Sequence, residues 1–286
     1  MGKAFAACKD NFRRWLTNPK LYVTFILIVI MQDYIMIASI RSFAREMGVG
    51  IGPWIYPFLP SSWYLCMLEA LGSVFLFCDA PMINQGTPYI FVRTGRRAWL
   101  GGQILYVVLA ALFYQMMFLL ASVLLILPQL EFTLQWGKAL GSLALTDMGM
   151  AYGAELSPVL VRQYTPIQAM LLSFSLRWMV TTLFGMLILT MNLFLPRIWG
   201  TIVGGVLALL HPTAINASGT VPFYFSPSSW TAVDYINLSG AAGIRTVSLF
   251  PTLSYIWTAG IGTIVLLIGI SCWGFRKKSI YSLSTL

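Results

Sequence analysis

Six stretches of the chain are almost entirely apolar, and most are about as long as a helix that crosses a lipid bilayer. The hydrocarbon core of a bilayer is about 30 Å thick, so a crossing takes about 20 apolar residues. The stretches cover about residues 21–40, 63–83, 104–127, 167–195, 198 onward and 255–273. We therefore predict an all-α integral membrane protein with six transmembrane helices.

Composition favours lipid over water as the solvent for much of the surface. Hydrophobic residues make up 58% of the 286 residues and charged residues only 9%, whereas a soluble domain carries roughly 25% charged residues. This balance excludes a water-soluble enzyme, a disordered chain and a nucleic-acid-binding module. The net charge of +9 is therefore not a sign of a nucleic-acid partner.

The N-terminal segment and the region around the fifth span of the membrane domain, residues 21–286, have features of their own. Residues 1–20 place Phe5, Cys8, Phe12 and Trp15 at helical spacing, which predicts an amphipathic helix in the membrane interface. The fifth apolar run ends at His211 and Pro212 after only 13 residues, short of a full crossing. We expect the apolar outer region 213–254, between spans five and six, to contain a re-entrant segment.

The basic residues predict how the chain lies in the cell membrane. With both termini in the cytoplasm, twelve of the 18 Lys and Arg residues fall on the inner side, five on the outer side and one inside a span. An excess of Lys and Arg is typical of cytoplasmic loops.

Residues for enzymatic chemistry are missing from the sequence. It has no phosphate-binding loop and no nucleophile-elbow motif, and its single histidine and four dispersed cysteines do not predict a metal site. We expect no catalytic residue, no metal and no cofactor bound by this chain.

The inner connection between the second and third spans, residues 84–100, carries aromatic and basic residues together. Arginine and aromatic side chains dominate binding energy at protein interfaces, which favours a docking element for a soluble partner. The alternative is a solvated basic loop. The candidate docking residues are Tyr89, Phe91, Arg93, Arg96, Arg97 and Trp99.

Several segments together resemble the type-2 ABC export permeases. They are the amphipathic N-terminus, the PheCysAspAlaPro run from Phe77, the ArgThrGlyArgArgAlaTrp run from Arg93 and SerProSerSerTrp from Ser226. The resemblance implies that the inner connection is a coupling helix on a separate cytoplasmic ATPase. It also implies two ATPase subunits, which bind ATP and Mg, and a second permease subunit, identical or homologous.

Three ionisable residues lie inside predicted spans, namely Asp33, Glu69 and Arg177. A charge at the bilayer centre costs about 2.5–3.5 kcal/mol on insertion scales, so such residues are candidates for function. The structural alternative is an internal ion pair between Arg177 and one of the two acids.

Small residues in the fifth span form a GxxxG pattern with Gly200, Gly204 and Gly205. Such a pattern allows close helix packing, either with the second permease or within the chain.

The leading interpretation is a permease subunit of an ATP-driven exporter for an amphipathic or apolar substrate such as a peptide, antibiotic or lipid. The alternative is an ATP-independent secondary transporter or channel that uses Asp33, Glu69 and Arg177.

Overall fold

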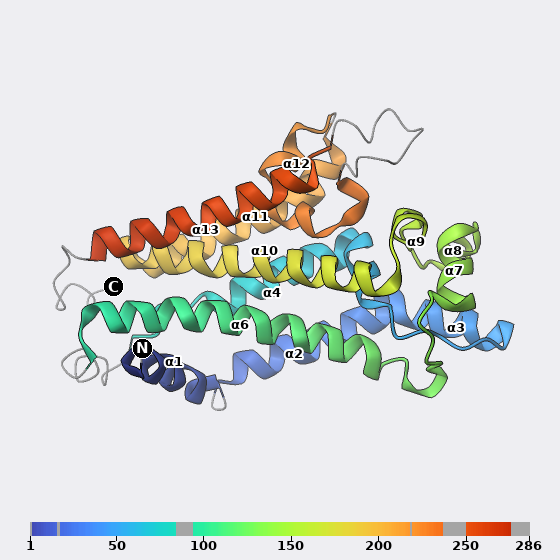
Figure 1. Ribbon diagram of the computed structural model, residues 1–286, viewed down its shortest axis with the longest axis horizontal. Coiled ribbons are helices and arrows are strands. Elements are labelled where there is room, and N and C mark those ends of the chain that lie inside the picture. Colours follow the sequence, from blue (N-terminus) through green and yellow to red (C-terminus); the bar gives the residue numbers. More distant parts are fainter. Residues whose placement is uncertain (1, 16–17, 84–93, 218, 237–249, 276–286) are drawn as a thin grey trace.

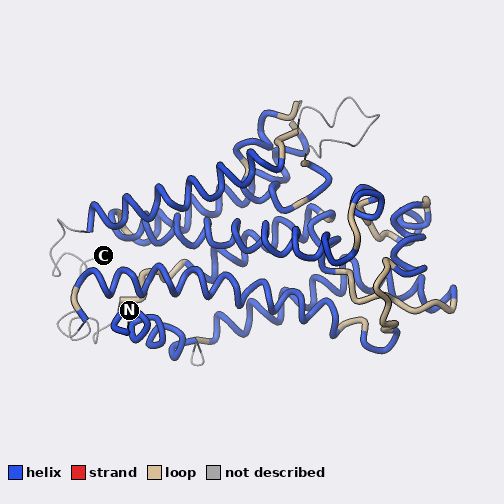
Figure 2. The backbone as a smooth tube through the Cα atoms, in the orientation of Figure 1, coloured by secondary structure: helices blue, strands red, loops and turns tan. Residues whose placement is uncertain are grey.

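The computed structural model describes residues 2–15, 18–83, 94–217, 219–236 and 250–275, and its regular elements in these ranges are helices (Figures 1 and 2). Five helices there are long and apolar enough to cross a membrane. The first, Pro19–Met47, consists of α2 (Pro19–Gln32), a π-helical turn η1 (Asp33–Ile37) and α3 (Ala38–Met47). The others are α6 (Arg96–Leu124), α10 (Pro166–Phe194), α11 (Arg197–Asn216) and α13 (Leu253–Phe275). These helices define a multi-pass membrane protein.

A sixth apolar helix, α4 (Trp63–Phe77), is shorter than the predicted second span. Its 15 residues extend over about 22 Å at 1.5 Å per residue, less than the bilayer core. Contacts with α2, α10 and α11 hold it inside the bundle. The starts of α1 and α6 and the end of α13 lie at one end of the molecule (Figure 1), which we call the connection end.

The N-terminal helix α1 (Gly2–Trp15) is amphipathic, as predicted, and it packs on α6. Cys8 and Trp15 are buried, whereas Phe5 is exposed. The Trp15 indole donates to the Tyr106 hydroxyl at 2.7 Å. The close approach depends on Gly102, because a Cβ there would lie 2.6 Å from that of Ala7.

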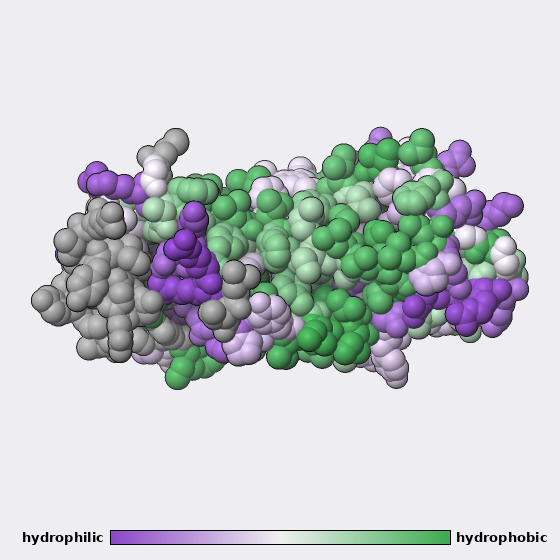
Figure 3. Space-filling model, turned by 90° about the horizontal axis from the view of Figure 1, so that it is seen from below, coloured by the Kyte–Doolittle hydropathy of each residue, from purple (hydrophilic) through white to green (hydrophobic). Residues whose placement is uncertain are grey.

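The surface of the bundle has the distribution of polarity expected in a bilayer. Figure 3 shows hydrophobic residues over the middle of one face, with hydrophilic residues toward the ends of the long axis. Large apolar side chains such as Ile26 on α2 and Val265 and Leu266 on α13 are exposed. Exposure of this kind is stable where lipid, not water, is the neighbour.

The end opposite the connection end, which we call the far end, is closed by short helices. They are η2 (Tyr56–Ser61), η3 (Leu127–Gln129), α7 (Gly137–Leu145), α8 (Met148–Tyr152) and α9 (Pro158–Gln163). The Ile51 amide donates to the Gln129 carbonyl, and the Ile51 carbonyl accepts from the Glu131 amide. These bonds join the loop before α4 to the loop after α6. In the loop before α4, η2 is buried among α4, α6 and α10.

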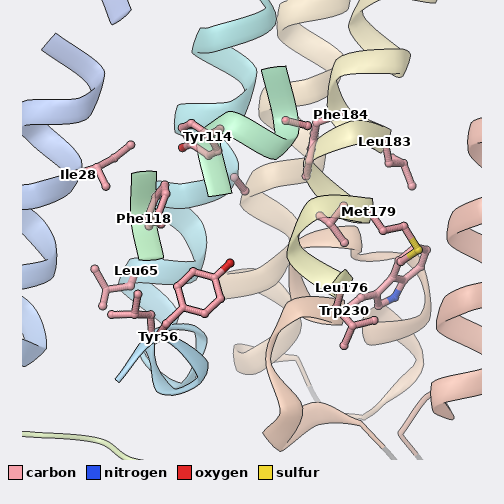
Figure 4. Packing of buried hydrophobic residues seen from close by; sticks show 14 of the residues in the cluster. Ile28, Tyr56, Leu65, Tyr114, Phe118, Leu176, Met179, Leu183, Phe184 and Trp230 are labelled. Atoms are coloured by element: carbon pink, nitrogen blue, oxygen red, sulfur yellow. The ribbon is translucent and has the colours of Figure 1, made fainter. Parts of the chain in front are cut away.

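The core is formed where η2, α4, α6 and α10 meet. Figure 4 shows Tyr56, Phe118 and Leu176 among the side chains that fill it. On α10 a Cβ at Gly185 would lie 2.6 Å from Val107 and 2.9 Å from Phe77, so glycine permits the close approach of three helices there.

The predicted stop of the fifth span at His211 and Pro212 is wrong, because α11 continues to Asn216. Proline removes the hydrogen bond to the carbonyl four residues earlier, here that of Ala208. The Ser228 hydroxyl donates to this carbonyl at 3.4 Å. A side chain from a later segment therefore satisfies the freed group, and the helix is not broken.

Between α11 and α13 the described residues form α12 (Val221–Phe225), η4 (Pro227–Thr231) and η5 (Val233–Tyr235). The buried turn η4 packs on α4, α10 and α11. These short helices fall within the predicted outer region, and a re-entrant path through the membrane stays a prediction.

Candidate functional site

Glu69 on α4 and Arg177 on α10 form a two-pronged ion pair in the core. The Arg177 Nε lies 2.9 Å from Glu69 Oε1, and Nη2 lies 2.8 Å from Oε2. Arg177 has 0% of its surface exposed and Glu69 has 6%. The predicted internal ion pair is therefore confirmed, with Glu69 as the acid.

Neighbouring groups satisfy most of the remaining hydrogen-bonding capacity of this pair. The Gln115 amide donates to Glu69 Oε1 at 2.8 Å and to the Thr181 hydroxyl at 2.7 Å. The Gln115 carbonyl oxygen accepts from the Tyr56 hydroxyl at 3.0 Å. Arg177 donates to the Tyr56 carbonyl at 3.2 Å. We call these five residues the buried polar cluster.

Two aromatic rings stabilise the positive charge of the cluster. The Arg177 guanidinium lies 4.0 Å from the centre of the Tyr56 ring and 5.1 Å from that of Phe118. Cation–π contacts are worth about 2 kcal/mol or more when desolvated. The arrangement joins η2, α4, α6 and α10 and is suited to fixing helix positions.

Asp33 does not belong to the cluster. Its carboxylate pairs with Arg41, about two helical turns along the same helix, at 2.6 Å. Arg41 also donates to the Leu125 carbonyl at 3.2 Å, so the pair links this helix to the end of α6. The structure thus separates the three predicted intramembrane charges into two sites.

The residues just before the inner connection are held to two other helices. Asp79 pairs with Lys20 of α2 at 2.9 Å. Asn192 of α10 donates to the carbonyls of Ala80 and Cys78 at 2.7 and 3.3 Å. The three residues after Phe77 are therefore tied to both α2 and α10.

The end of the connection continues directly into α6. Arg96 and Arg97 are exposed on its first turn. Trp99 is not available as an anchor for a partner, because it is buried and stacks on Phe275 of α13 with ring centres 5.5 Å apart. The other predicted docking residues, Tyr89, Phe91 and Arg93, lie outside the described residues.

The glycines of α11 divide between two roles. A Cβ at Gly200 would lie 2.3 Å from the Asn192 side chain, and one at Gly204 would lie 3.2 Å from Val74. These two glycines therefore serve packing within the chain. Around Gly205 no described atom comes within 4 Å of a Cβ, so this position leaves room for a partner.

A serine-rich cluster beside α11 was missed by sequence reasoning. His211 Nδ1 lies 2.8 Å from the Ser229 hydroxyl, which in turn donates to the Ser226 hydroxyl at 2.8 Å. Both serines are buried. The sequence signal for this cluster is the SerProSerSer run, whose hydroxyls lie beside the part of α11 that contains Pro212.

Asp234, in η5, is expected to make the stability of the far end depend on pH. Burial raises its pKa from 3.8, although hydrogen bonds from Ser157 and Ser61 oppose the rise. A raised pKa means that the folded state keeps the proton to a higher pH than the unfolded state does. The free energy of unfolding therefore falls as pH rises past 3.8. Relative to Asp234→Asn, the wild-type thermal midpoint should drop between pH 4 and pH 7, while exposed Asp147→Asn should reproduce the wild-type profile. Parallel profiles for wild type and Asp234→Asn would contradict this.

Comparison of the chain with family models, curated proteins and solved structures found no match. The class of protein therefore rests on the helices themselves, which are those of a multi-pass membrane protein. Within the described ranges, no group of three or more His, Cys, Asp and Glu residues is placed to hold a metal ion.

Proposed function

We propose that the chain is the permease subunit of an ATP-driven ABC exporter in the cell membrane, with six spans and both termini in the cytoplasm. The observation that carries the proposal is the anchoring of the inner connection. The residues just before it, Asp79 and Ala80, are tied to α2 through Lys20 and to α10 through Asn192. Its end is the first turn of α6, which is joined to α13 through Trp99.

Such anchoring suits a connection that transmits force. A partner that moved residues 84–93 would pull on four long helices together, because the described residues before and after this segment are held by side chains from other helices. The 29 residues of α6 extend about 43 Å and carry Gln115 of the buried polar cluster. Motion at the connection end can therefore reach the core through one continuous helix.

The partners of this permease are two cytoplasmic ABC ATPase subunits and a second permease subunit, identical or homologous. Gly205 supports the second of these, since it lies between exposed apolar residues of α11, among them Ile202, Val206 and Leu209. ATP and Mg bind the ATPase subunits. The substrate class, an amphipathic or apolar molecule such as a peptide, antibiotic or lipid, follows from the resemblance to export permeases.

The alternative function is an ATP-independent secondary transporter or channel. It requires Glu69 and Arg177 to meet water or ions in some state of the cycle. Their near-complete burial and mutual neutralisation favour a fixed structural pair instead, and Asp33 is neutralised separately by Arg41.

The double substitution Tyr89→Ala/Phe91→Ala should abolish coupling to the ATPase. If these rings are buried anchors, the loss is about 2 kcal/mol or more of binding, or roughly 30-fold in affinity. Co-purification of the ATPase and its stimulation by the permease in proteoliposomes are the measurements. Both should fall, while membrane insertion stays unchanged.

The matched control is Phe132→Ala/Leu134→Ala, which removes two exposed apolar side chains at the far end and should leave coupling intact. Normal recruitment and stimulation by Tyr89→Ala/Phe91→Ala would remove the coupling assignment. Transport without any ATPase would favour the channel or secondary transporter.

A further inference from the structure

A groove of about 530 Å³ lies between the beginning of α6 and the end of α13. This volume is within the range of about 300–1,000 Å³ that is typical of ligand sites. Its wall from α6 includes Arg96, Arg97, Leu100 and Ile104, and its wall from α13 includes Cys272 and Phe275.

The lining changes from cationic to apolar along the groove. The two arginines occupy the first turn of α6, and Leu100 and Ile104 follow at spacings of three, four, seven and eight residues, which is one face of a helix. Ile104 therefore lies about 12 Å further along the helix than Arg96. A ligand that fits this order has an anionic group at one end and a hydrocarbon chain at the other.

The start of α6 adds to the attraction for an anion. Gly95 occupies the N-cap and supplies no side-chain hydrogen bond, and the amide groups and positive dipole end of a helix N-terminus attract anions. Arginine binds phosphate oxygens with two parallel hydrogen bonds.

The groove opens beside a surface that faces lipid. Cys272 is exposed, and its neighbours Ile270 and Trp273 on α13 are exposed large apolar residues. In a membrane, the amphiphile always present at such a surface is a phospholipid.

We propose that this groove binds an anionic phospholipid, with its phosphate at Arg96 and Arg97 and an acyl chain between α6 and α13. The lipid would brace the same two helices that the Trp99–Phe275 stack joins. The site shares Arg96 and Arg97 with the predicted docking residues, but it requires no ATPase and would exist equally in a channel or secondary transporter.

Protection of Cys272 from an uncharged maleimide tests the proposal in the full chain. A Cys78→Ser background leaves Cys272 as the exposed thiol, since Cys8 and Cys66 are buried. In nanodiscs, labelling should slow as phosphatidylglycerol replaces phosphatidylcholine with the same acyl chains. An uncharged reagent is used so that the surface potential does not change its local concentration.

Removal of the two charges should shift this protection. Each basic residue near an anionic membrane contributes about 1 kcal/mol, so Arg96→Gln/Arg97→Gln should need roughly 30-fold more phosphatidylglycerol for half-protection. Arg45→Gln/Arg162→Gln, which neutralises two exposed arginines at the far end, is the matched control and should behave as the parent. Equal shifts for the two variants, or equal protection by both lipids, would overturn the proposal.

Two further arms separate the lipid from simpler ligands. Cys272→Trp fills the apolar part of the groove without a change of charge, and it should abolish the rise in thermal midpoint that phosphatidylglycerol gives the parent in detergent. Glycerophosphate, which has the anionic group but no acyl chain, should give neither protection nor stabilisation. If glycerophosphate acts as strongly as the lipid, the groove is a phosphate site and the lipid proposal is wrong.

Discussion

Replacement of Arg177 by methionine is expected to lower the free energy of unfolding by about 3–5 kcal/mol, because it leaves the Glu69 carboxylate buried without its counter-charge. The carboxylate would keep its hydrogen bond from Gln115 but lose both contacts with the guanidinium. The Tyr56 carbonyl would lose a donor as well. Unfolding by sodium dodecyl sulfate in mixed micelles is a suitable measurement.

The double variant Glu69→Met/Arg177→Met should recover most of this loss. Replacement of a whole buried ion pair by apolar residues of similar size is often neutral or stabilising, whereas removal of one partner is costly. Measured with both single variants, the four proteins form a double-mutant cycle that isolates the coupling energy. A double variant as unstable as Arg177→Met would show that the two charges do not compensate each other.

The same double variant distinguishes the two candidate functions. If the pair only fixes the positions of α4 and α10, ATP-driven transport should persist once stability is restored. If Glu69 and Arg177 are parts of an ion pathway, transport should disappear although the protein folds. This measurement bears on function independently of the inner connection.

The membrane spans could be predicted because their signal is local. About 20 apolar residues in succession have few alternatives to a membrane helix, and five such helices are present in the described residues. The ion pair could be predicted in kind, because an isolated charge in the core is too costly to leave without a partner.

Which of Asp33 and Glu69 pairs with Arg177 could not be predicted, because it depends on which sides of the helices pack together. Arg177 is on α10, which packs directly on α4, so Glu69 is within reach. Asp33 instead begins a π-helical turn and finds Arg41 on its own helix. Sequence spacing alone does not show this turn.

Two further differences between the sequence predictions and the structure also come from tertiary contacts. Pro212 stays inside a helix because Ser228, sixteen residues later, supplies a donor to the freed carbonyl. Trp99 has the composition of an interface anchor, yet Phe275 from the last helix covers it. In both cases the deciding neighbour comes from a later part of the sequence, which local patterns do not reveal.

The second large expected effect is a loss of stability on substitution of a glycine in α11. In Gly200→Leu, the new Cβ would lie 2.3 Å from the Asn192 side chain and 3.0 Å from the Ile188 carbonyl. Overpacking of a core costs about 1–3 kcal/mol, and we expect the upper end because the Ile188 carbonyl is backbone. Asn192 would also be displaced from the Ala80 carbonyl to which it donates, which should loosen the residues just before the inner connection.

Gly205→Leu is the matched substitution on the same helix, and it should leave the monomer as stable as the parent or more stable. No described atom lies within 4 Å of its Cβ position, and leucine gains up to about 1 kcal/mol over glycine as a helix former. If the second permease packs at this face, Gly205→Leu should instead weaken self-association, measured by sedimentation equilibrium in detergent. If self-association is unchanged, the GxxxG pattern serves only packing within the chain. If both substitutions destabilise the monomer equally, the assignment of Gly200 to intrachain packing and of Gly205 to an open face is wrong.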